Sequence, residues 1–561
     1  MATDPVLRDA IRDRLRALDK QRFGERLWQR DPGVWKDDPD HRAVIAGALG
    51  WLNVAEAMQT KVDDIVAFAS SVASDGFHDA VLLGMGGSSL APEVLCATFG
   101  VTEGFLDLRI CDSTDPSAVR ALERSVDPTK TVFVVASKSG GTTETACFHA
   151  YFHDRLRQLV GDAAGRHFVA ITDPDTSLHR VAVEQRFRAV FLNPPDIGGR
   201  YSALSYFGLV PAALAGVDIG RLLERARHAA AACGPAVKAR ENPAVKLGAA
   251  LGELALRGHD KMTIVASPGV ASFGAWLEQL LAESTGKEGK GILPVDGESL
   301  GPPEVYGDDR AFVYLRLSGE HDAHSKEALH ALSSSGLPVM SLAINDLWDL
   351  GGEFLRWEIA TAAAGAVLGI DPFDQPNVQE AKDATRRLLR AYVADGELPA
   401  ATTGPEGGPS SVSVGDEGAA AAVGELLAVL GPDDYFAVQA YVPPSEQVYR
   451  ILQGVRLAVR DRFRVATTVG YGPRYLHSTG QLHKGGPPHG VFLQLTCGQA
   501  EGDLEIPGQK FTFGVLKTAQ ARGDLEALQA RGLRVLNVDL GDDPLPGLTA
   551  LGGIVADLVR R

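Results

Sequence analysis

The segment with the clearest chemical character is residues 131–145, TVFVVASKSGGTTET. Its first half is a Val-rich apolar run of strand length, which predicts a strand buried on both faces. A Ser/Thr/Gly loop and a helix-like segment follow, so free backbone N–H groups, hydroxyls and the positive end of a helix dipole meet at one place. Lys138 adds a full charge. Because the segment lacks the G-x-x-x-x-G-K-[ST] pattern of nucleoside triphosphate sites, it predicts a site for a phosphomonoester.

A second glycine-rich loop, GMGGSS at residues 84–89, follows another apolar strand. It is close to a dinucleotide fingerprint, with Asp112 after the next strand where an acid would bind ribose, but Ser89 replaces the third glycine. Three interpretations are open: a tight turn without function, a dinucleotide site, and a loop whose amides close on a sugar phosphate. The nearby segment 131–145 favours the third.

Two charged residues stand in contexts that favour a functional interpretation. Arg200, in GGRYS, follows adjacent glycines that allow close backbone approach, and its guanidinium is a fixed positive charge. Glu283 ends an apolar helix in LLAESTGK, with Gln279 one turn earlier on the same face, and a carboxylate there suits a general base. Each has an ordinary alternative, a surface arginine and a solvated glutamate at a helix end.

Other candidate residues come later in the chain. In FDQPNVQEAK, at residues 373–382, prolines fix a helix start, Gln375 can donate to phosphate, and Lys382 lies about two turns along. An amphipathic helix with a surface lysine is the alternative. In HSTGQLHKGG, His477 and His483 stand within seven residues beside glycines, which favours a functional interpretation alongside a structural one.

The composition limits the class of protein. A chain of 561 residues should hold more than one domain, and a formal charge of −16 argues against a nucleic-acid partner. Five scattered cysteines without C-x-x-C spacing fit reduced thiols in the cytoplasm. No signal core or membrane-spanning stretch is seen, and the fourteen histidines show no metal-ligand spacing. We expect a cytoplasmic protein with no membrane partner, no metal and no cofactor.

Short apolar strands alternate with helices, which predicts parallel α/β sheets. The expected strands are 80–83, 106–111, 132–136, 168–171, 190–192, 262–266, 311–317, 339–344, 435–441, 465–468, 490–495 and 535–539. The predicted organisation is an N-terminal helical segment over 1–55, α/β domains over 56–240 and 241–395, a Gly/Pro/Ser-rich linker over 396–418, and a C-terminal α/β portion over 419–561. Trp28, Trp35 and Trp51 should pack the first segment onto the body.

The motifs together resemble those of the glucose-6-phosphate isomerase (phosphoglucose isomerase) family, whose domains have the sugar-isomerase (SIS) fold. The chain has GMGGSS and SKSGGTTET, then GGRYS, ESTGK and FDQ-x-x-V-x-x-x-K, in the family's order over about residues 50–395. It looks most like the isomerase half of fused transaldolase–isomerase proteins, without a transaldolase barrel. The resemblance implies two doubly wound parallel-sheet SIS domains, no metal, and a homodimer with a shared active site.

The resemblance also implies roles for individual residues. Glu283 would carry a proton between C2 and C1 through a cis-enediol, Arg200 would stabilise that intermediate, and Lys382 would help to open the sugar ring. The substrate-binding residues would be Gly86, Gly87, Ser88, Ser137, Lys138, Ser139, Thr142, Thr145, Gln279 and Gln375.

The sequence departs from the family's pattern at the ring-opening histidine. That residue follows the catalytic glutamate in the family, but here the matching region, residues 349–353, has no histidine. GYGPRYLHSTGQLHKGG, late in the chain, looks like the missing segment relocated. We expect His477 to take the role, with His483 as the second candidate, and Lys517 in FTFGVLK as a weaker rival to Lys382.

The expected function is therefore the reversible isomerisation of glucose 6-phosphate and fructose 6-phosphate, in glycolysis and gluconeogenesis. One alternative is a non-catalytic SIS-domain sugar-phosphate sensor, which has no reason to combine Glu283, Arg200 and Lys382. A Rossmann-type dehydrogenase using residues 84–89 is another. A third is a bifunctional phosphoglucose/phosphomannose isomerase, for which the small pair Ser284–Thr285 beside the base could leave room.

Overall fold

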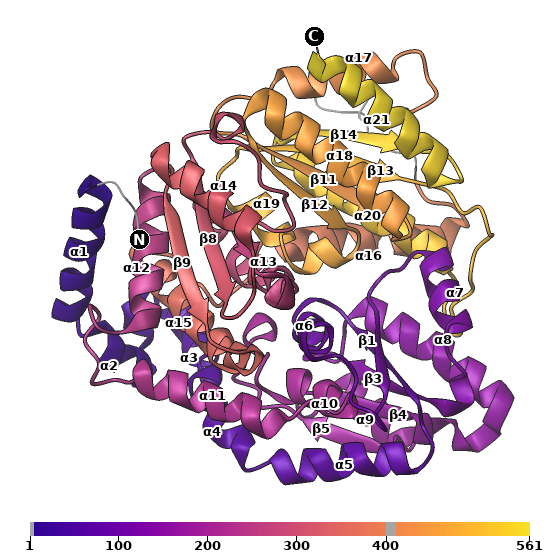
Figure 1. Ribbon diagram of the computed structural model, residues 1–561. Helices are drawn as coiled ribbons and strands as arrows, with labels where there is room; N and C mark the ends of the chain where they lie inside the picture. Colours follow the sequence, from indigo (N-terminus) through magenta and orange to yellow (C-terminus); the bar gives the residue numbers. More distant parts are fainter. Residues whose placement is uncertain (1–4, 400–410, 561) are drawn as a thin grey trace.

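A computed structural model describes residues 5–399 and 411–560. Its strands form three sheets in which all strand pairs are parallel (Figure 1). The first sheet has the order β2-β1-β3-β4-β5, the second β7-β6-β8-β9 and the third β10-β14-β13-β11-β12. The strands are β1 (Asp79–Gly84), β2 (Asp107–Cys111), β3 (Thr131–Ala136), β4 (Phe168–Thr172), β5 (Ala189–Leu192), β6 (Lys261–Ala266), β7 (Leu293–Val295), β8 (Arg310–Leu317), β9 (Val339–Ile344), β10 (Ser411–Ser413), β11 (Tyr435–Tyr441), β12 (Ala466–Tyr471), β13 (Gly490–Thr496) and β14 (Arg534–Asp539).

The three sheets share one topology. Counted in chain order, the first two read 2-1-3-4, with β5 added to the first, and the third reads the same from β11, with β10 added at its far edge. This doubly wound order has a switch point between its first and third strands, where connections leave on opposite faces and ligands commonly bind. The predicted α/β class with doubly wound parallel sheets is confirmed, and the C-terminal portion repeats the topology of the other two.

Two short strands were not expected from the sequence. β7 is three residues long and contains Pro294, so it gives no apolar run of strand length. β10 lies inside residues 396–418, where a linker was predicted, and it pairs with β14 through residues 537–539. Part of that predicted linker, 400–410, lies outside the described residues, while its end is an edge strand of the third sheet.

Helices cover the faces of the sheets and join them. They are α1 (Pro5–Lys20), α2 (Phe23–Trp28), α3 (Pro39–Ala46), α4 (Val54–Gln59), α5 (Val62–Ser74), α6 (Leu90–Phe99), α7 (Pro116–Arg124), α8 (Thr143–Val160), α9 (Ser177–Glu184), α10 (Tyr206–Leu214), α11 (Ile219–Ala232), α12 (Pro243–Leu256), α13 (Phe273–Thr285), α14 (Ala323–Ser334), α15 (Leu350–Leu368), α16 (Val378–Asp395), α17 (Ala419–Ala428), α18 (Glu446–Phe463), α19 (Gly480–Gly485), α20 (Phe513–Ala530) and α21 (Pro544–Arg560). No helix in the described ranges is long and apolar enough to cross a bilayer.

The N-terminal helices pack on the body through their tryptophans, as expected. The Trp35 indole donates a hydrogen bond to the Ala362 carbonyl, and the Trp28 indole to the Cys233 carbonyl. Trp51 is fully buried and stacks on Tyr201 with ring centroids 5.1 Å apart. Because Tyr201 follows Arg200, this packing supports one of the predicted site residues from behind.

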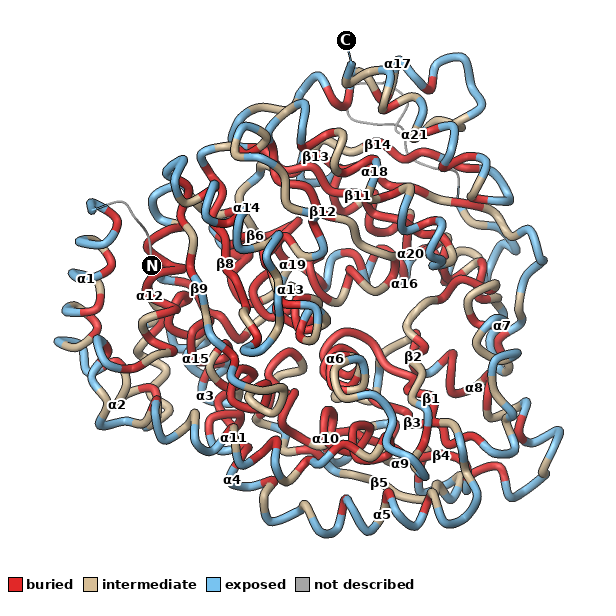
Figure 2. The backbone as a smooth tube through the Cα atoms, in the orientation of Figure 1, coloured by how far each residue is buried: buried red, intermediate tan, exposed pale blue. Residues whose placement is uncertain are grey.

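Buried side chains run continuously between the units. In Figure 2 the strands inside the three sheets, such as β3, β8 and β11, are buried, whereas the outer turns of α1 and α5 are exposed. One apolar cluster joins the N-terminal helices to the first two sheets, and a second joins the first sheet to α16 and α20. α16, which was predicted to belong to the second domain, packs along α20, which flanks the third sheet. Through this contact, α16 at the end of the second unit and α20 of the third unit pack together on the first unit.

Candidate active site

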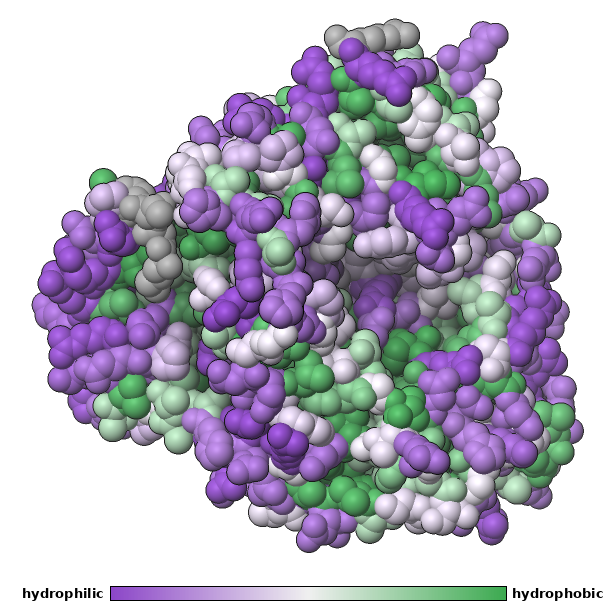
Figure 3. All heavy atoms as spheres, in the orientation of Figure 1, coloured by the Kyte–Doolittle hydropathy of each residue, from purple (hydrophilic) through white to green (hydrophobic). Residues whose placement is uncertain are grey.

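The predicted phosphate loop lies at the switch point of the first sheet. It leaves the carboxyl end of β3 next to β1, and α8 begins directly after it with Thr142 at the N-cap position. A cavity of about 340 Å³ opens there, and Figure 3 shows the surface hollowed between the region of α16 and that of α8. Its described lining comes from all three units: Ser139, Gly141, Thr142, Thr143, Glu144, Gln375, Val378, Gln379, Ala381, Lys382, Thr385, Arg386, Leu389, Leu476, His477, Lys484, Leu516 and Gln520.

Hydroxyl groups converge within the loop. Ser137 Oγ and Thr142 Oγ1 lie 2.9 Å apart, and the Gly141 N–H donates to Ser139 Oγ over 3.3 Å. Thr145 Oγ1 is buried and has no hydrogen-bond partner within the described residues. A buried hydroxyl without a partner is uncommon in a folded protein, and a polar ligand at the loop would satisfy it. The loop therefore keeps the character of an anion site.

Lys138 does not supply the free charge that the sequence suggested. Its Nζ lies 2.5 Å from Asp173 Oδ2 and donates to the Pro195 carbonyl over 3.0 Å. Its side chain is absent from the described cavity lining. The Lys138 charge is therefore compensated by an acid 35 positions along the chain, and binding of substrate by Lys138 stays a prediction.

The first glycine loop closes on protein backbone, not on the cavity. A Cβ on Gly87 would lie 2.1 Å from the Gly199 carbonyl oxygen, and one on Gly86 would lie 2.7 Å from the His477 carbonyl oxygen. Gly86 also has a positive φ of 53°. Neither glycine nor Ser88 is among the residues described as lining the cavity. The small residues let the segments that carry Arg200 and His477 approach each other, so direct binding of substrate through Gly86, Gly87 and Ser88 remains a prediction.

Arg200 and Glu283 form the charged centre of the site. Arg200 is nearly fully buried, and its Nη1 lies 3.2 Å from Glu283 Oε1. Its other N–H groups donate to Ser284 Oγ, to Gln375 Oε1 and to carbonyls of residues 372 and 374 over 2.6–2.9 Å. A planar guanidinium with five donors suits this many acceptors. The arrangement places a fixed cation directly beside the predicted base.

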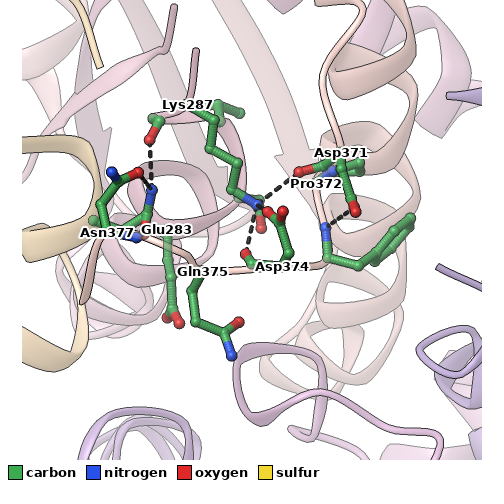
Figure 4. A network of polar contacts seen from close by, with 12 residues as sticks. Glu283, Lys287, Asp371, Pro372, Asp374, Gln375 and Asn377 are labelled. Atoms are coloured by element: carbon green, nitrogen blue, oxygen red, sulfur yellow. Dashed lines mark hydrogen bonds and ion pairs between the residues drawn. The ribbon is translucent and has the colours of Figure 1, made fainter. Parts of the chain in front are cut away.

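Gln279 connects the predicted base to the histidine segment. Its Nε2 donates to Glu283 Oε2 over 3.0 Å and to the His477 carbonyl over 2.7 Å, while its Oε1 is buried without a partner among the described residues. In Figure 4 the side chains of Glu283 and Gln375 extend toward the same side, away from Lys287. Glu283 and Gln375 therefore face a common space next to the cavity.

The loop that carries Gln375 is held by Lys287. The Lys287 ammonium donates to the carbonyls of Asp371 and Asp374 and pairs with the Asp374 carboxylate at 2.6 Å (Figure 4). Burial and the neighbouring Arg200 lower the pKa of Lys287 to about 8. This cation fixes the same backbone that accepts hydrogen bonds from Arg200.

One group of described residues could in principle ligate a metal: His41, Asp371 and Asp374. His41 Nδ1 lies 3.4 Å from Asp371 Oδ2 and 3.8 Å from Asp374 Oδ2. The acids already have protein partners, because Lys287 pairs with Asp374 and the Phe373 N–H donates to Asp371. The group is an ion-pair cluster on the outer side of the loop. Sequence spacing could not indicate it, since His41 is 330 positions from Asp371.

His477 reaches the cavity from the third unit of the same chain. Its Nε2 lies 3.1 Å from Oε1 of Glu144, the second residue of α8. Burial opposes ionisation of Glu144, but the His477 charge, its hydrogen bond and Lys382 together hold the pKa of Glu144 below its ordinary value. The resemblance implied a histidine donated by a partner subunit. In the described chain His477 lies at this cavity, and the active site shared across a homodimer stays a prediction.

The rival residues lie elsewhere. His483 packs against Tyr435 and Phe492 in the interior, and burial, with Lys484 nearby, lowers the pKa of His483 to about 3. Lys517 pairs with Asp115 at 2.9 Å and is not part of the described cavity lining. Lys382 lines the cavity, and its ammonium has no hydrogen bond or ion pair within the part of the chain that the structure describes. Geometry therefore favours His477 and Lys382 over both rivals.

The polar residues at the cavity that were not singled out from the sequence include Glu144, Lys484 and Gln520. Glu144 was in view only as part of SKSGGTTET, and its partner is 333 positions away. Lys484 pairs with Asp524 at 2.5 Å. Gln520 donates to Glu144 over 2.7 Å. Lys484 and Gln520 come from the third unit, where no local motif pointed to them.

Comparison with known proteins identifies the family. The phosphoglucose isomerase family model matches residues 43–292. The chain is 30% identical over 370 residues to a glucose-6-phosphate isomerase of Rubrobacter xylanophilus, covering 56% of this chain and 84% of that protein. The chain belongs to the phosphoglucose isomerase family. Another member, a glucose-6-phosphate isomerase of Thermus thermophilus, is 29% identical over 62% of this chain and 92% of its own.

Solved structures agree with the fold of this family member. A hypothetical protein from Thermus thermophilus matches with a TM-score of 0.59 and 25% identity, over 68% of this chain and 97% of that one. A glucose-6-phosphate isomerase from Chlamydia trachomatis matches with a TM-score of 0.51 and 22% identity, over 67% and 79%. In the dehydrogenase alternative, Asp112 would bind the ribose of a dinucleotide. Asp112 Oδ2 is instead paired with Arg474 at 2.9 Å, which argues against that alternative. The recognition of the family from its motifs is confirmed.

Proposed function

We propose that this protein interconverts glucose 6-phosphate and fructose 6-phosphate, as an aldose–ketose isomerase of glycolysis and gluconeogenesis. The observation that carries the proposal is that Lys382 and His477 line one cavity with a loop suited to a phosphomonoester, while Glu283 pairs with Arg200 beside it and is linked to the His477 segment through Gln279. These residues come from all three units, so their proximity is a property of the fold. A sensor would need the phosphate loop but would have no use for a carboxylate base beside a guanidinium.

Phosphate binding orients the substrate. The proposed ligands are the hydroxyls of Ser137, Ser139, Thr142 and Thr145, with backbone amides at the start of α8 and Gln375. The N-terminus of a long helix and free N–H groups favour a dianion. Holding this remote group fixes the reacting carbons near the base, so the binding energy contributes to the rate.

Ring opening falls to His477 and Lys382. One must give a proton to the ring oxygen while the other takes the proton of the C1 or C2 hydroxyl. The ionised Glu144 accepts from His477 Nε2, which leaves Nδ1 for the substrate and stabilises the imidazolium when it forms. Lys382 lines the same cavity with an unpaired ammonium among the described contacts, so it can act on the opposite side of the sugar.

Proton transfer falls to Glu283. Its carboxylate removes the proton from C2 of the open aldose while O1 takes up a proton, which forms a cis-enediol. Glu283 then returns its proton to C1 while O2 loses a proton, which gives the ketose. Arg200, 3.2 Å from Glu283, is placed to stabilise negative charge on the enediol oxygens. Because its other donors are used by the loop at residues 372–375, the guanidinium needs no rearrangement during the reaction.

The test is an EDTA-treated coupled assay for glucose 6-phosphate formed from fructose 6-phosphate. Wild type should turn over, and Glu283→Gln should lose kcat by at least about 10³-fold while still binding a phosphorylated sugar acid. Glu304→Gln, at an exposed position, is the matched control and should behave as wild type. Binding of fructose 6-phosphate by wild type without turnover would indicate a sensor and refute the proposal.

Assembly and compartment are further parts of the proposal. The four proposed catalytic residues come from three units of one chain, so the proposed site needs no residue from a second copy. A cytoplasmic location is supported by the five cysteines, all of which carry free thiols.

A further inference from the structure

Helix α20 of the third unit contacts two adjacent residues of the first unit, Thr114 and Asp115. Lys517 Nζ lies 2.9 Å from Asp115 Oδ2, and one turn later Gln520 Oε1 accepts a hydrogen bond from Thr114 Oγ1 over 2.7 Å. All four side chains are buried. Two polar contacts one helical turn apart fix both the register and the rotation of α20 against this segment. Lys517, a rival for the catalytic lysine, thus has a different use.

The second of these contacts continues into the catalytic cavity. The Gln520 amide has its oxygen occupied by Thr114, so its Nε2 points to Glu144 and donates to Oε1 over 2.7 Å. The same oxygen accepts from His477 Nε2 at 3.1 Å. The chain Thr114–Gln520–Glu144–His477 alternates between the first and third units, so it forms only when the third unit is docked.

We propose that Gln520 is a positioning residue for ring opening, which acts on His477 through Glu144. The inference rests on the proposed function, and it adds a residue of the third unit to the machinery. A donor on Oε1 stabilises the carboxylate against its protonated form, so Glu144 remains an acceptor. His477 is thereby kept with its proton on Nε2, and Nδ1 stays available to the sugar.

The other charged groups near this series of hydrogen bonds either favour the Glu144 carboxylate as well or are paired with acids of their own. Lys382 lines the cavity beside Glu144 and also favours its carboxylate. Lys484 lines the cavity too, but its ammonium is paired with Asp524. Arg474, on the segment that carries His477, is paired with Glu93 and Asp112. Gln520 is the neutral donor that touches Glu144 directly.

The test replaces Gln520 with Met, which has similar length but cannot donate. The matched control is Gln494→Met: Gln494 is also buried and donates to the Ala521 carbonyl of α20, yet it does not line the catalytic cavity. A second variant, Thr114→Val, removes the hydroxyl that donates to Gln520 Oε1 and leaves the Gln520 side chain itself unchanged. Thermal unfolding scans verify that each variant is folded.

The first readout is the pH titration of His477 ring nitrogens by NMR, assigned with His477→Ala. Loss of a hydrogen bond to a carboxylate raises its basicity, so Gln520→Met should move the His477 titration up by about one pH unit. Thr114→Val should give a smaller shift in the same direction, and Gln494→Met none. An unmoved titration in Gln520→Met, or an equal shift in Gln494→Met, would overturn the proposal, since the contact would then only pack α20.

The second readout is the pH profile of kcat/KM for fructose 6-phosphate. Its acid limb should move up with the His477 titration in Gln520→Met, while affinity for an acyclic phosphorylated sugar acid at pH 8 stays within about twofold. A shifted titration in a protein whose wild type never turns over would support the contact and refute the proposed function. A shifted titration with an unmoved acid limb would refute the role in ring opening.

Discussion

Replacement of Arg200 by Lys tests the electrostatic centre of the site. The guanidinium makes four hydrogen bonds, to Ser284, Gln375 and two backbone carbonyls, in addition to the ion pair with Glu283. An ammonium has three donors and cannot reproduce the fork, so at least one or two buried acceptors would lose their partner. At about 1–3 kcal/mol for each, the variant should be destabilised by roughly 2–4 kcal/mol.

The effect on catalysis should exceed the effect on binding. If Arg200 stabilises the enediol, its loss should lower kcat about 10²–10³-fold, whereas KM should change by less than about tenfold. Arg310→Lys is the matched control, because Arg310 is equally buried and pairs with Glu298 far along the second sheet. It should lower the melting temperature comparably without affecting kcat of the folded enzyme. A melting temperature lowered by Arg200→Lys with wild-type kcat would refute the reasoning.

Three other substitutions follow from the contacts. Gly87→Ala should lower the melting temperature and abolish turnover, because its Cβ would meet the Gly199 carbonyl at 2.1 Å, whereas Gly553→Ala, with open space around it, should be tolerated. Glu278→Gln should raise the melting temperature at pH 9 but not at pH 4. Burial and the nearby Asp296 raise the pKa of Glu278 to about 8. The protonated carboxyl therefore contributes its full stability below about pH 4.5, and this contribution is lost as the pH rises through 8. Lys138→Met should destabilise the protein yet change KM for fructose 6-phosphate less than about threefold, and a larger rise in KM would return Lys138 to the phosphate site.

Much of the fold could be predicted because its signals are local. The strands that were found, such as 132–136 and 435–441, are uninterrupted apolar runs followed by turn residues, and their burial on both faces explains that pattern. β7 and β10 were missed because three residues with a proline, or with serines in a Gly/Pro-rich stretch, carry no such signal. The common 2-1-3-4 order of the sheets depends on pairing between distant strands, which periodicity does not encode.

The site could be predicted where one short segment holds a chemical unit. GGRYS, ESTGK and FDQ brought Arg200, Glu283 and Gln375 into consideration, and the structure places them in contact. The partners of other site residues are distant in the sequence. Asp173 lies 35 positions from Lys138, and Glu144 lies 333 positions from His477. Gln520 lies 376 positions from Glu144, to which it donates. Such pairs arise from the pairing of strands within a unit or from the docking of units, so they follow from the fold and not from spacing.

The central claim is that one chain holds the complete isomerase site, and mixing two inactive variants tests it most directly. Glu283→Gln lacks the base and His477→Ala lacks the ring-opening histidine, so each should be inactive alone. If every site draws both residues from the same chain, the two variants unfolded and refolded together, or expressed together, should show no more activity than the sum of the separate proteins. Recovery of a substantial part of the wild-type rate in the mixture would show that the histidine acts across subunits, and it would contradict this account.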